Sequence, residues 1–259
     1  MRKSLLMAAL AAAVVGLSFG EGDGTQVKPV PAIVVPDTVA SADDTAAPAD
    51  DKATTFTDTR DGQVYRIVKI GRQYWFAENL NYAAKGSKCY ENKNANCARY
   101  GRLYDWNTAM KACPAGTHLS SSKEWETLVN YAGGEDIAGK RLKSTRDWYY
   151  YSEKKFNNGT DNYGFTALPC GQFDNSDGDF SYDGTRGFWW SASRESAWNP
   201  QCGCSVRTKK EESKRQPIYW YIEYERHLIG GAISPDRSDH FSVRCVLDES
   251  DVSNKEGEQ

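Results

Sequence analysis

The stretch CPAGTHLSSSKEWETL, residues 113–128, joins a cysteine, a Pro-Gly turn and a histidine to the start of a helix. Ser121 and Glu124 form an S-x-x-E capping box, in which each side chain satisfies a backbone N–H, and such a cap is worth about 1 kcal/mol. Residues at i, i+3, i+4 and i+7 make one apolar face, namely Trp125, Leu128, Val129 and Ala132. Gly133 and Gly134 supply the stop. The serines therefore start a helix and need no catalytic role.

Cys113 and His118 raise the question of a reactive pair within this stretch. They are separated by a Pro-Gly turn, so their side chains need not meet. Catalysis would also require a third group that orients the base. We therefore expect His118 to be a packed or hydrogen-bonded structural residue.

Residues 1–20 have the pattern of a signal peptide. Arg2 and Lys3 give a positive start, an apolar Leu/Ala/Val run follows, and Ser18 and Gly20 are small residues at plausible cleavage positions. The apolar run is shorter than the roughly 20 residues of a membrane span, and no cysteine follows it. We expect neither a stable membrane span nor a lipid anchor, and export permits disulfides.

The rest of the chain divides into a linker, a folded part and a tail. Residues 21–55 are rich in Pro, Ala, Thr and Asp and lack the apolar surface to fold alone, so a disordered linker is predicted. Residues 56–248 hold all eight Trp and all fifteen Tyr, and a length of roughly 190 residues suits one domain. Residues 249–259 are a polar tail that we predict to be disordered.

The charge pattern argues against nucleic acid as a partner. The formal net charge is -3, and the basic cluster at residues 207–216 is interrupted by Glu211 and Glu212. A solvated loop explains such a cluster in an exported protein.

The folded part begins with the pattern of a β-hairpin and ends with that of several strands. Residues 64–70 alternate as in a strand, a Gly-Arg turn follows, and residues 73–77 return as a second strand. Beyond residue 134, short aromatic segments alternate with Gly/Asn/Asp turns, which indicates further strands. With helices between the hairpin and these strands, the order of elements predicts an α+β fold.

Two features lie between the hairpin and the capped helix. Residues 90–97 have the composition of an Asn/Lys-rich loop, and a disulfide between Cys89 and Cys97 is plausible there. Residues 100–113 have apolar side chains near helical spacing, which favours a short helix. The sequence thus predicts two helices in all.

A series of short motifs along the folded part carries a family resemblance. In order they are DGQVY (61–65), IGRQYWFAENLNY (70–82), YGRLYDW (100–106), CPAGTHL (113–119), GTDNYGFTALP (159–169) and SVRCV (242–246). Over residues 58–246 the chain resembles the Fibrobacter succinogenes major paralogous domain (FISUMP) family. Its members are typically exported surface or secreted proteins of Bacteroidetes and Fibrobacteres-type bacteria, and the family has no agreed biochemical activity.

The resemblance implies a C-type lectin-like fold, with an N-terminal hairpin and two helices followed by a strand- and loop-rich half. In such a layout the chain ends come together, and a bridge often ties a helix region to the last strand. Cys113 and Cys245 both lie in family motifs and suit that bridge, which would close a long loop worth roughly 4–5 kcal/mol. The sequence departs from the family pattern at Thr117, where Trp is usual, and at Ser120, where Pro is usual.

The seven cysteines are an odd number, so at least one thiol is free or paired with another chain. Cys170, Cys202 and Cys204 look like additions to the family pattern. They put extra covalent ties, or a free thiol, in the loop-rich half. The connectivity cannot be deduced from sequence alone.

One segment is a candidate for metal binding. The loop at residues 173–184 is rich in acidic residues, and Asp174, Asp177 and Asp179 offer the hard oxygen ligands that calcium prefers. Their spacing misses the EF-hand pattern, and a solvated turn explains the same composition. The three histidines show no zinc-type spacing. No cofactor is expected apart from this possible calcium ion.

Aromatic clusters mark the candidate ligand site. The segments WYYY (148–151) and YWY (219–221) are expected on strands, where successive side chains face opposite sides. One side belongs to the core, and the other can offer an exposed platform on which sugar rings stack. The residues assigned to the platform are Tyr149, Tyr151, Tyr219 and Tyr221. Trp189 and Trp190 are assigned to the core.

These observations predict an exported, non-enzymatic binding or adhesion module, secreted or associated with the outer-membrane surface of a Gram-negative bacterium. Its ligand is expected to be a polysaccharide or an envelope protein, although fold does not fix function. One alternative is a cysteine-dependent oxidising enzyme of the formylglycine-generating type, a C-type lectin-like relative, with only Cys170, Cys202 and Cys204 as candidate thiols. Another alternative is a structural envelope protein without a small ligand.

Overall fold

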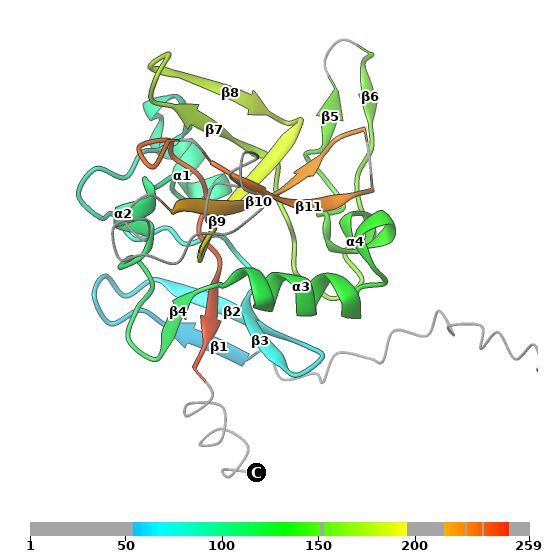
Figure 1. Ribbon diagram of the computed structural model, residues 1–259, viewed down its shortest axis with the longest axis horizontal. Coiled ribbons are helices and arrows are strands. Elements are labelled where there is room, and N and C mark those ends of the chain that lie inside the picture. The colour runs from blue at the N-terminus through cyan, green and yellow to red at the C-terminus, as the bar shows by residue number, and fades with distance from the viewer. Residues whose placement is uncertain (1–53, 151–152, 196–214, 226, 235, 249–259) are drawn as a thin grey trace, which may run out of the picture. The chain divides into compact units, whose positions relative to one another are not determined.

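The computed structural model describes residues 54–150, 153–195, 215–225, 227–234 and 236–248. Within those ranges it contains two five-stranded sheets, a two-stranded sheet and four α-helices (Figure 1). The fold class is therefore mixed α+β, as the order of elements predicts. The predicted signal peptide, nearly all of the predicted linker and the predicted tail lie outside the described residues.

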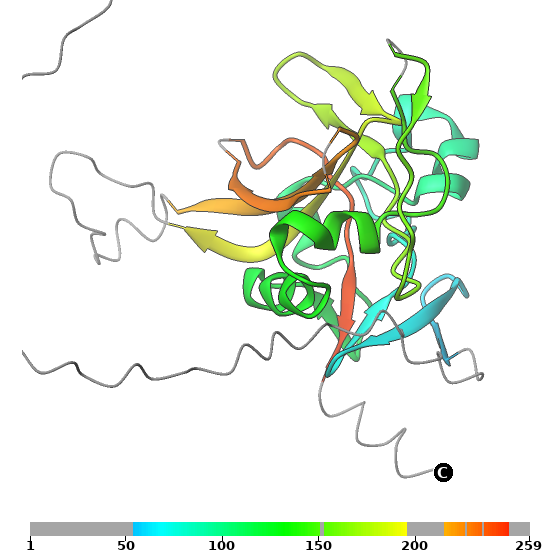
Figure 2. The ribbon, with the colours of Figure 1, turned by 90° about the vertical axis from the view of Figure 1, so that its right-hand side faces the viewer.

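The first sheet joins the two ends of the folded part, and all of its neighbouring strands are antiparallel. In spatial order the strands are β1 (Thr54–Thr57), β2 (Val64–Ile70), β3 (Gln73–Phe76), β12 (Cys245–Leu247) and β4 (Thr117–Leu119). The predicted hairpin is confirmed, because β2 and β3 pair up to Ile70 opposite Gln73. Figure 2 shows β12 running down to this hairpin, so the last strand completes the sheet that the first strands begin.

The second sheet contains aromatic strands that the sequence predicts. In spatial order its strands are β11 (Ile229–Ile233), β10 (Gln216–Glu223), β9 (Arg186–Glu195), β7 (Cys170–Asp174) and β8 (Asp179–Asp183). Strands β7 and β9 pair in parallel, and the other neighbours are antiparallel. Trp189 and Trp190 of β9 are fully buried, which confirms their assignment to the core. A separate hairpin consists of β5 (Tyr149–Tyr150) and β6 (Lys155–Phe156).

Helix α3 (Ser122–Tyr131) begins at the predicted capping box. The Glu124 N–H donates to Ser121 Oγ at 3.3 Å, and the Ser121 N–H donates to Glu124 Oε2 at 2.7 Å. The predicted apolar face is buried, so the helix follows its sequence pattern at both the cap and the core-facing side.

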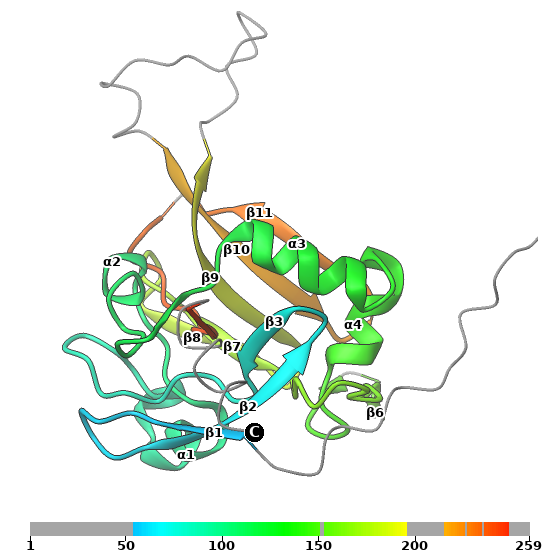
Figure 3. The same cartoon turned by 90° about the horizontal axis from the view of Figure 1, so that it is seen from below.

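Trp125 of α3 links the helix to both sheets. Its ring centroid lies 5.0 Å from that of Trp75 on β3 and 5.8 Å from that of Trp220 on β10. All three side chains belong to one buried cluster. Helix α3 is therefore packed between the two sheets (Figure 3).

The prediction of a loop at residues 90–97 is wrong. That segment contains a 3-10 turn, η1 (Tyr90–Asn92), and the start of helix α1 (Asn94–Tyr100). Asn has low intrinsic helix propensity, but a disulfide between Cys89 and Cys97 closes the segment. Covalent closure and packing outweigh local propensity here.

The short helix expected within residues 100–113 is confirmed as the four-residue α2 (Trp106–Ala109). Helix α4 (Glu135–Leu142) has no counterpart in the sequence prediction. Its charges match the helix dipole, with acidic residues in the first turn and basic residues in the last: Glu135, Asp136, Lys140 and Arg141.

Arg244, from the SVRCV motif, is fully buried within the fold. Its Nε–H donates to Asn79 Oδ1 at 2.7 Å, and Trp189 Nε1–H donates to the same oxygen at 2.8 Å. The guanidinium also donates to three backbone carbonyl groups at 2.7–2.9 Å, those of Phe76, Phe165 and Thr166. Burial lowers the pKa of Arg244 to about 10, so the side chain stays charged at neutral pH. This buried cation thus connects its own segment to residues 76–79 and 165–166 and, through Asn79, to β9.

Cys170 is a candidate for a disulfide by sequence, but it does not form one in the structure. It is a free thiol with no exposed surface, 3.0 Å from Ser242 Oγ. Burial raises the pKa of the Cys170 thiol, which disfavours the reactive thiolate. Cys202 and Cys204 lie outside the described residues.

We predict that Arg244→Lys lowers the free energy of unfolding by about 3 kcal/mol or more, because lysine keeps the charge but cannot satisfy the same fork of acceptors. Urea denaturation of the full chain measures the change. Arg72→Lys, on the exposed turn between β2 and β3, is the matched control and should cost less than about 0.5 kcal/mol. Equal stability of the two variants would contradict the role given to Arg244.

Candidate functional site

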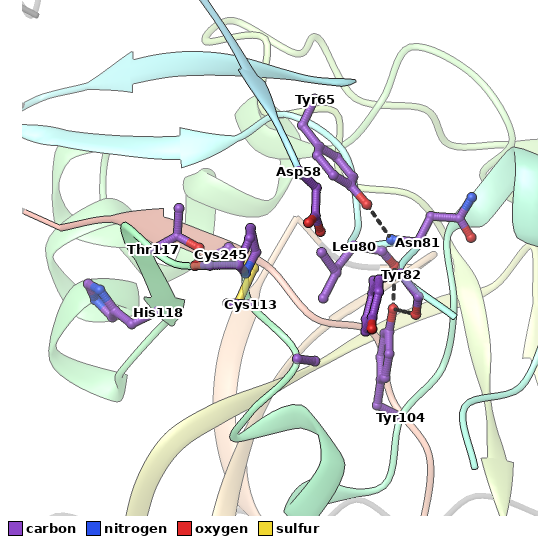
Figure 4. Close-up of a disulfide and its surroundings, with 12 residues drawn as sticks. Asp58, Tyr65, Leu80, Asn81, Tyr82, Tyr104, Cys113, Thr117, His118 and Cys245 are labelled. Carbon is purple, nitrogen blue, oxygen red and sulfur yellow. Dashed lines mark hydrogen bonds between the residues drawn. A yellow bond between two sulfur atoms is a disulfide. The ribbon is translucent and has the colours of Figure 1, made fainter. Parts of the chain in front are cut away.

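Cys113 and His118 do not form a reactive pair. Cys113 is in a disulfide with Cys245, with Cα atoms 5.9 Å apart, so it offers no thiolate. Figure 4 shows His118 on β4 pointing away from that disulfide. The bridge spans a sequence separation of 132 residues and ties the segment before β4 to β12, as the family resemblance implies.

His118 instead holds the helix start to the end of the sheet. Its Nε2 lies 2.7 Å from Glu124 Oε1, and its Nδ1 lies 2.6 Å from Asp248 Oδ1. The hydrogen bond to Glu124, aided by that to Asp248 and opposed by burial, raises the pKa of His118 to about 9. Both ring nitrogens donate when the imidazole is charged. The expectation of a hydrogen-bonded structural histidine is confirmed.

The acidic loop predicted as a possible calcium site is the turn of the β7–β8 hairpin. Asp174 pairs with Asp179 across the hairpin. Asp174 Oδ1 accepts the N–H groups of Ser176 at 2.9 Å and Asp177 at 3.3 Å, which is turn chemistry. In the described part of the chain, no three His, Cys, Asp or Glu side chains gather closely enough to hold a metal ion. The solvated-turn interpretation fits this geometry.

Tyr219 and Tyr221 of β10 form the centre of the candidate ligand site. Their ring centroids are 6.0 Å apart, and both side chains are only partly exposed. Across the strand pair, Tyr219 lies opposite Trp190 and Tyr221 lies opposite Phe188. Trp220, between the two tyrosines, faces the other side and is buried against α3. Tyr219 and Tyr221 therefore lie on the side of β10 opposite Trp220, where they pack against a second buried cluster and keep part of their surface exposed.

The two tyrosines rest on a rigid support. The Tyr219 ring lies 5.0 Å from that of Phe241 and 6.0 Å from that of Phe188, and both phenylalanines are buried. Tyr221 lies across Gly230 of β11, where an added Cβ would come within 3.5 Å of its ring. Neither tyrosine hydroxyl makes a hydrogen bond to another described residue. The hydroxyl groups can therefore serve a ligand.

Tyr182 on β8 is a third tyrosine at this place, and the sequence prediction misses it. Its side chain is 42 % exposed, and its ring lies 5.8 Å from that of Phe188. Its φ of +69° lies in the left-handed region that a bulky residue rarely adopts, and such outliers are enriched at functional sites. The only sequence signal is the Asp-Gly turn that follows it, which brings β8 back to β9. We call Tyr182, Tyr219 and Tyr221 the tyrosine face.

An ion pair lies beside the tyrosine face. Arg186 Nη2 is 3.1 Å from Glu223 Oε1, and the Arg186 guanidinium lies 4.5 Å from the Tyr182 ring centroid. Burial raises the pKa of Tyr219, which favours the protonated hydroxyl as a hydrogen-bond donor. Tyrosine rings with protonated hydroxyl groups suit ligands that have both C–H faces and hydroxyl groups.

The other tyrosines assigned to the platform are placed differently. Tyr149 lies on the β5–β6 hairpin, where its ring packs 4.7 Å from that of Phe156. Tyr151 lies outside the described residues. The structure thus brings Tyr219 and Tyr221 together and puts Tyr149 on another hairpin.

A small pocket lies away from the tyrosine face, beneath α1. It encloses about 90 Å³ and is lined by residues such as Tyr65, Glu78, Asn81 and Arg99. A single water needs roughly 10–15 Å³ by this measure, so the pocket has room for a few waters. It is too small to hold an oligosaccharide.

The fold and its cysteines define a class of protein. Its described residues form a mixed α+β module that contains two disulfides, a feature typical of proteins that fold outside the cytoplasm. None of the described helices has the length and apolar character needed to cross a bilayer.

The chain belongs to the Fibrobacter succinogenes major domain family, whose sequence profile matches residues 68–247. No curated protein matches the chain. No solved structure matches it either.

We predict that the stabilising contribution of His118 is lost at alkaline pH. Its pKa is about 9 when folded against an ordinary value of 6.5, so its contribution is fully present below about pH 6.5 and is lost as pH rises through 9. Because the His118 side chain is 42 % exposed, we expect a loss below about 1 kcal/mol. Chemical denaturation between pH 6 and about 9.5 should show this slope in the wild type and not in His118→Gln. Parallel slopes would exclude the role.

Proposed function

We propose that this protein is a non-enzymatic binding or adhesion module that holds a polysaccharide on the tyrosine face. The observation that carries the proposal is a cluster of partly exposed tyrosines on a buried aromatic support, with hydroxyls of Tyr219 and Tyr221 that no described residue uses. Aromatic rings attract the C–H faces of sugars, and tyrosine adds a polar handle. Because the rings are held by packing, little entropy is lost on binding.

We further propose that the fold is C-type lectin-like and that the protein is secreted or held at the surface of a Gram-negative bacterium. Support for the fold comes from the shared sheet, in which the first and last strands meet, and from the bridge between Cys113 and Cys245. Support for export comes from the signal-peptide pattern at residues 1–20 and from the disulfides.

The enzymatic alternative has less support. An oxidising enzyme of the formylglycine-generating type needs an accessible pair of thiols. Cys170 is buried and its thiol pKa is raised, so only Cys202 and Cys204, outside the described residues, remain as candidates. A structural envelope protein without a small ligand is the other alternative, and the binding experiment below separates it from a polysaccharide-binding module.

We predict that the oxidised full chain is retained by soluble or insoluble polysaccharides in a binding panel, and that Tyr221→Ala weakens retention about tenfold. Tyr219→Phe, which removes only the hydroxyl, should weaken it less. Tyr131→Ala is the control, since Tyr131 is 56 % exposed on α3.

The panel is run with calcium and with a chelator, and melting temperatures confirm that each variant is folded. Retention that is insensitive to the chelator is expected, because the acidic turn forms no metal cluster among the described residues. No retention of the wild type on any polysaccharide, with capture of an envelope protein instead, would refute the proposal.

A further inference from the structure

The side of β9 that faces Tyr219 carries buried aromatic residues and ends at two arginines near Trp106. Alternate residues of a strand face one side, and Phe188, Trp190 and Ala192 all pack with Trp106 in one cluster. Arg194 is the next residue in this alternation, and it is exposed. Its guanidinium carbon lies over the Trp106 ring, 5.7 Å from the centroid.

Arg237 places a second guanidinium over the same indole, 5.3 Å from the ring centroid. The arginine is fixed at two further points, because it donates to the backbone carbonyl of Arg215 and its own carbonyl accepts the Trp106 N–H at 2.9 Å. A guanidinium that stacks on an aromatic face keeps the N–H groups at its edges available for hydrogen bonds. The two charges are therefore held in place before any ligand arrives.

No described carboxylate neutralises these arginines through an ion pair. Asp105, next to Trp106, accepts the N–H and hydroxyl of Thr108. Asp236, next to Arg237, accepts the N–H and hydroxyl of Ser238. Both acidic neighbours are thus engaged in their own turns, which leaves the guanidinium groups for an external anion.

We propose that the ligand is an acidic polysaccharide, whose sugar rings lie on the tyrosine face while its carboxylates bind Arg194 and Arg237. This inference rests on the function proposed above and names its substrate class. Arginine binds a carboxylate through two parallel N–H bonds, and such charge-assisted pairs are stronger than neutral ones. Arg194 is four residues along β9 from Trp190, which lies opposite Tyr219, a distance of about 13 Å. A ligand must therefore contain several sugar rings to contact both Tyr219 and Arg194.

The test compares two forms of one polymer on the oxidised full chain. Polygalacturonate carries a carboxylate on each sugar, and its fully methyl-esterified form has the same backbone without the charge. We expect calorimetry to give affinity at least about tenfold higher for polygalacturonate at low salt. The double variant Arg194→Gln/Arg237→Gln should remove that difference, whereas Arg72→Gln, an exposed arginine on the other sheet, should keep it.

The outcomes separate the two proposals. A preference for the acid form that the double variant abolishes, and that weakens as salt is raised, supports the inference. Equal binding of both forms, lost in Tyr221→Ala but not in the double variant, overturns the inference and leaves the proposed function standing. No binding of either form, or of any neutral polysaccharide, overturns both.

Discussion

The buried guanidinium of Arg244 is the constraint on which the rest of the structure depends. A charge removed from water is tolerated only when its donors find acceptors, and here they are supplied by Asn79 and by carbonyls of three other residues. Trp189 of β9 donates to the same Asn79 oxygen. The second sheet is therefore hydrogen-bonded to the segment that follows β3 of the first sheet. Arg244 and Asn79 both lie in sequence motifs that carry the resemblance to the family. These motifs therefore specify the structural core more than a ligand site.

The candidate ligand surface is the reverse side of that structural core. Strand β9 turns Trp189 inward toward Asn79 and α3, and it turns Phe188 and Trp190 toward the tyrosine face. One alternating strand thus carries both the core contact and the support of the site.

Local signals in the sequence predict local structure well. The capping box at Ser121 and the hairpin turn at Gly71 act over a few residues, and the structure has both. The loop predicted at residues 90–97 is wrong because the short-range disulfide between Cys89 and Cys97, together with packing, outweighs the low helix propensity of this Asn-rich segment. Site geometry is less predictable still. Tyr182 reaches the tyrosine face through an unusual backbone conformation, and Trp106 meets Arg194 and Arg237 only because distant segments fold together.

The proposed ligand binds on the side of β8, β9 and β10 that carries the tyrosine face. Amide chemical-shift mapping by NMR tests this placement most directly, with the full chain titrated by acidic oligogalacturonate. We expect the shifted amides to cluster around Tyr182, in β9 and β10, and near Trp106, while those around Arg244 and the small pocket beneath α1 stay unchanged. Shifts centred on that pocket or on the β5–β6 hairpin, or no shifts with any oligosaccharide, would contradict the proposed site.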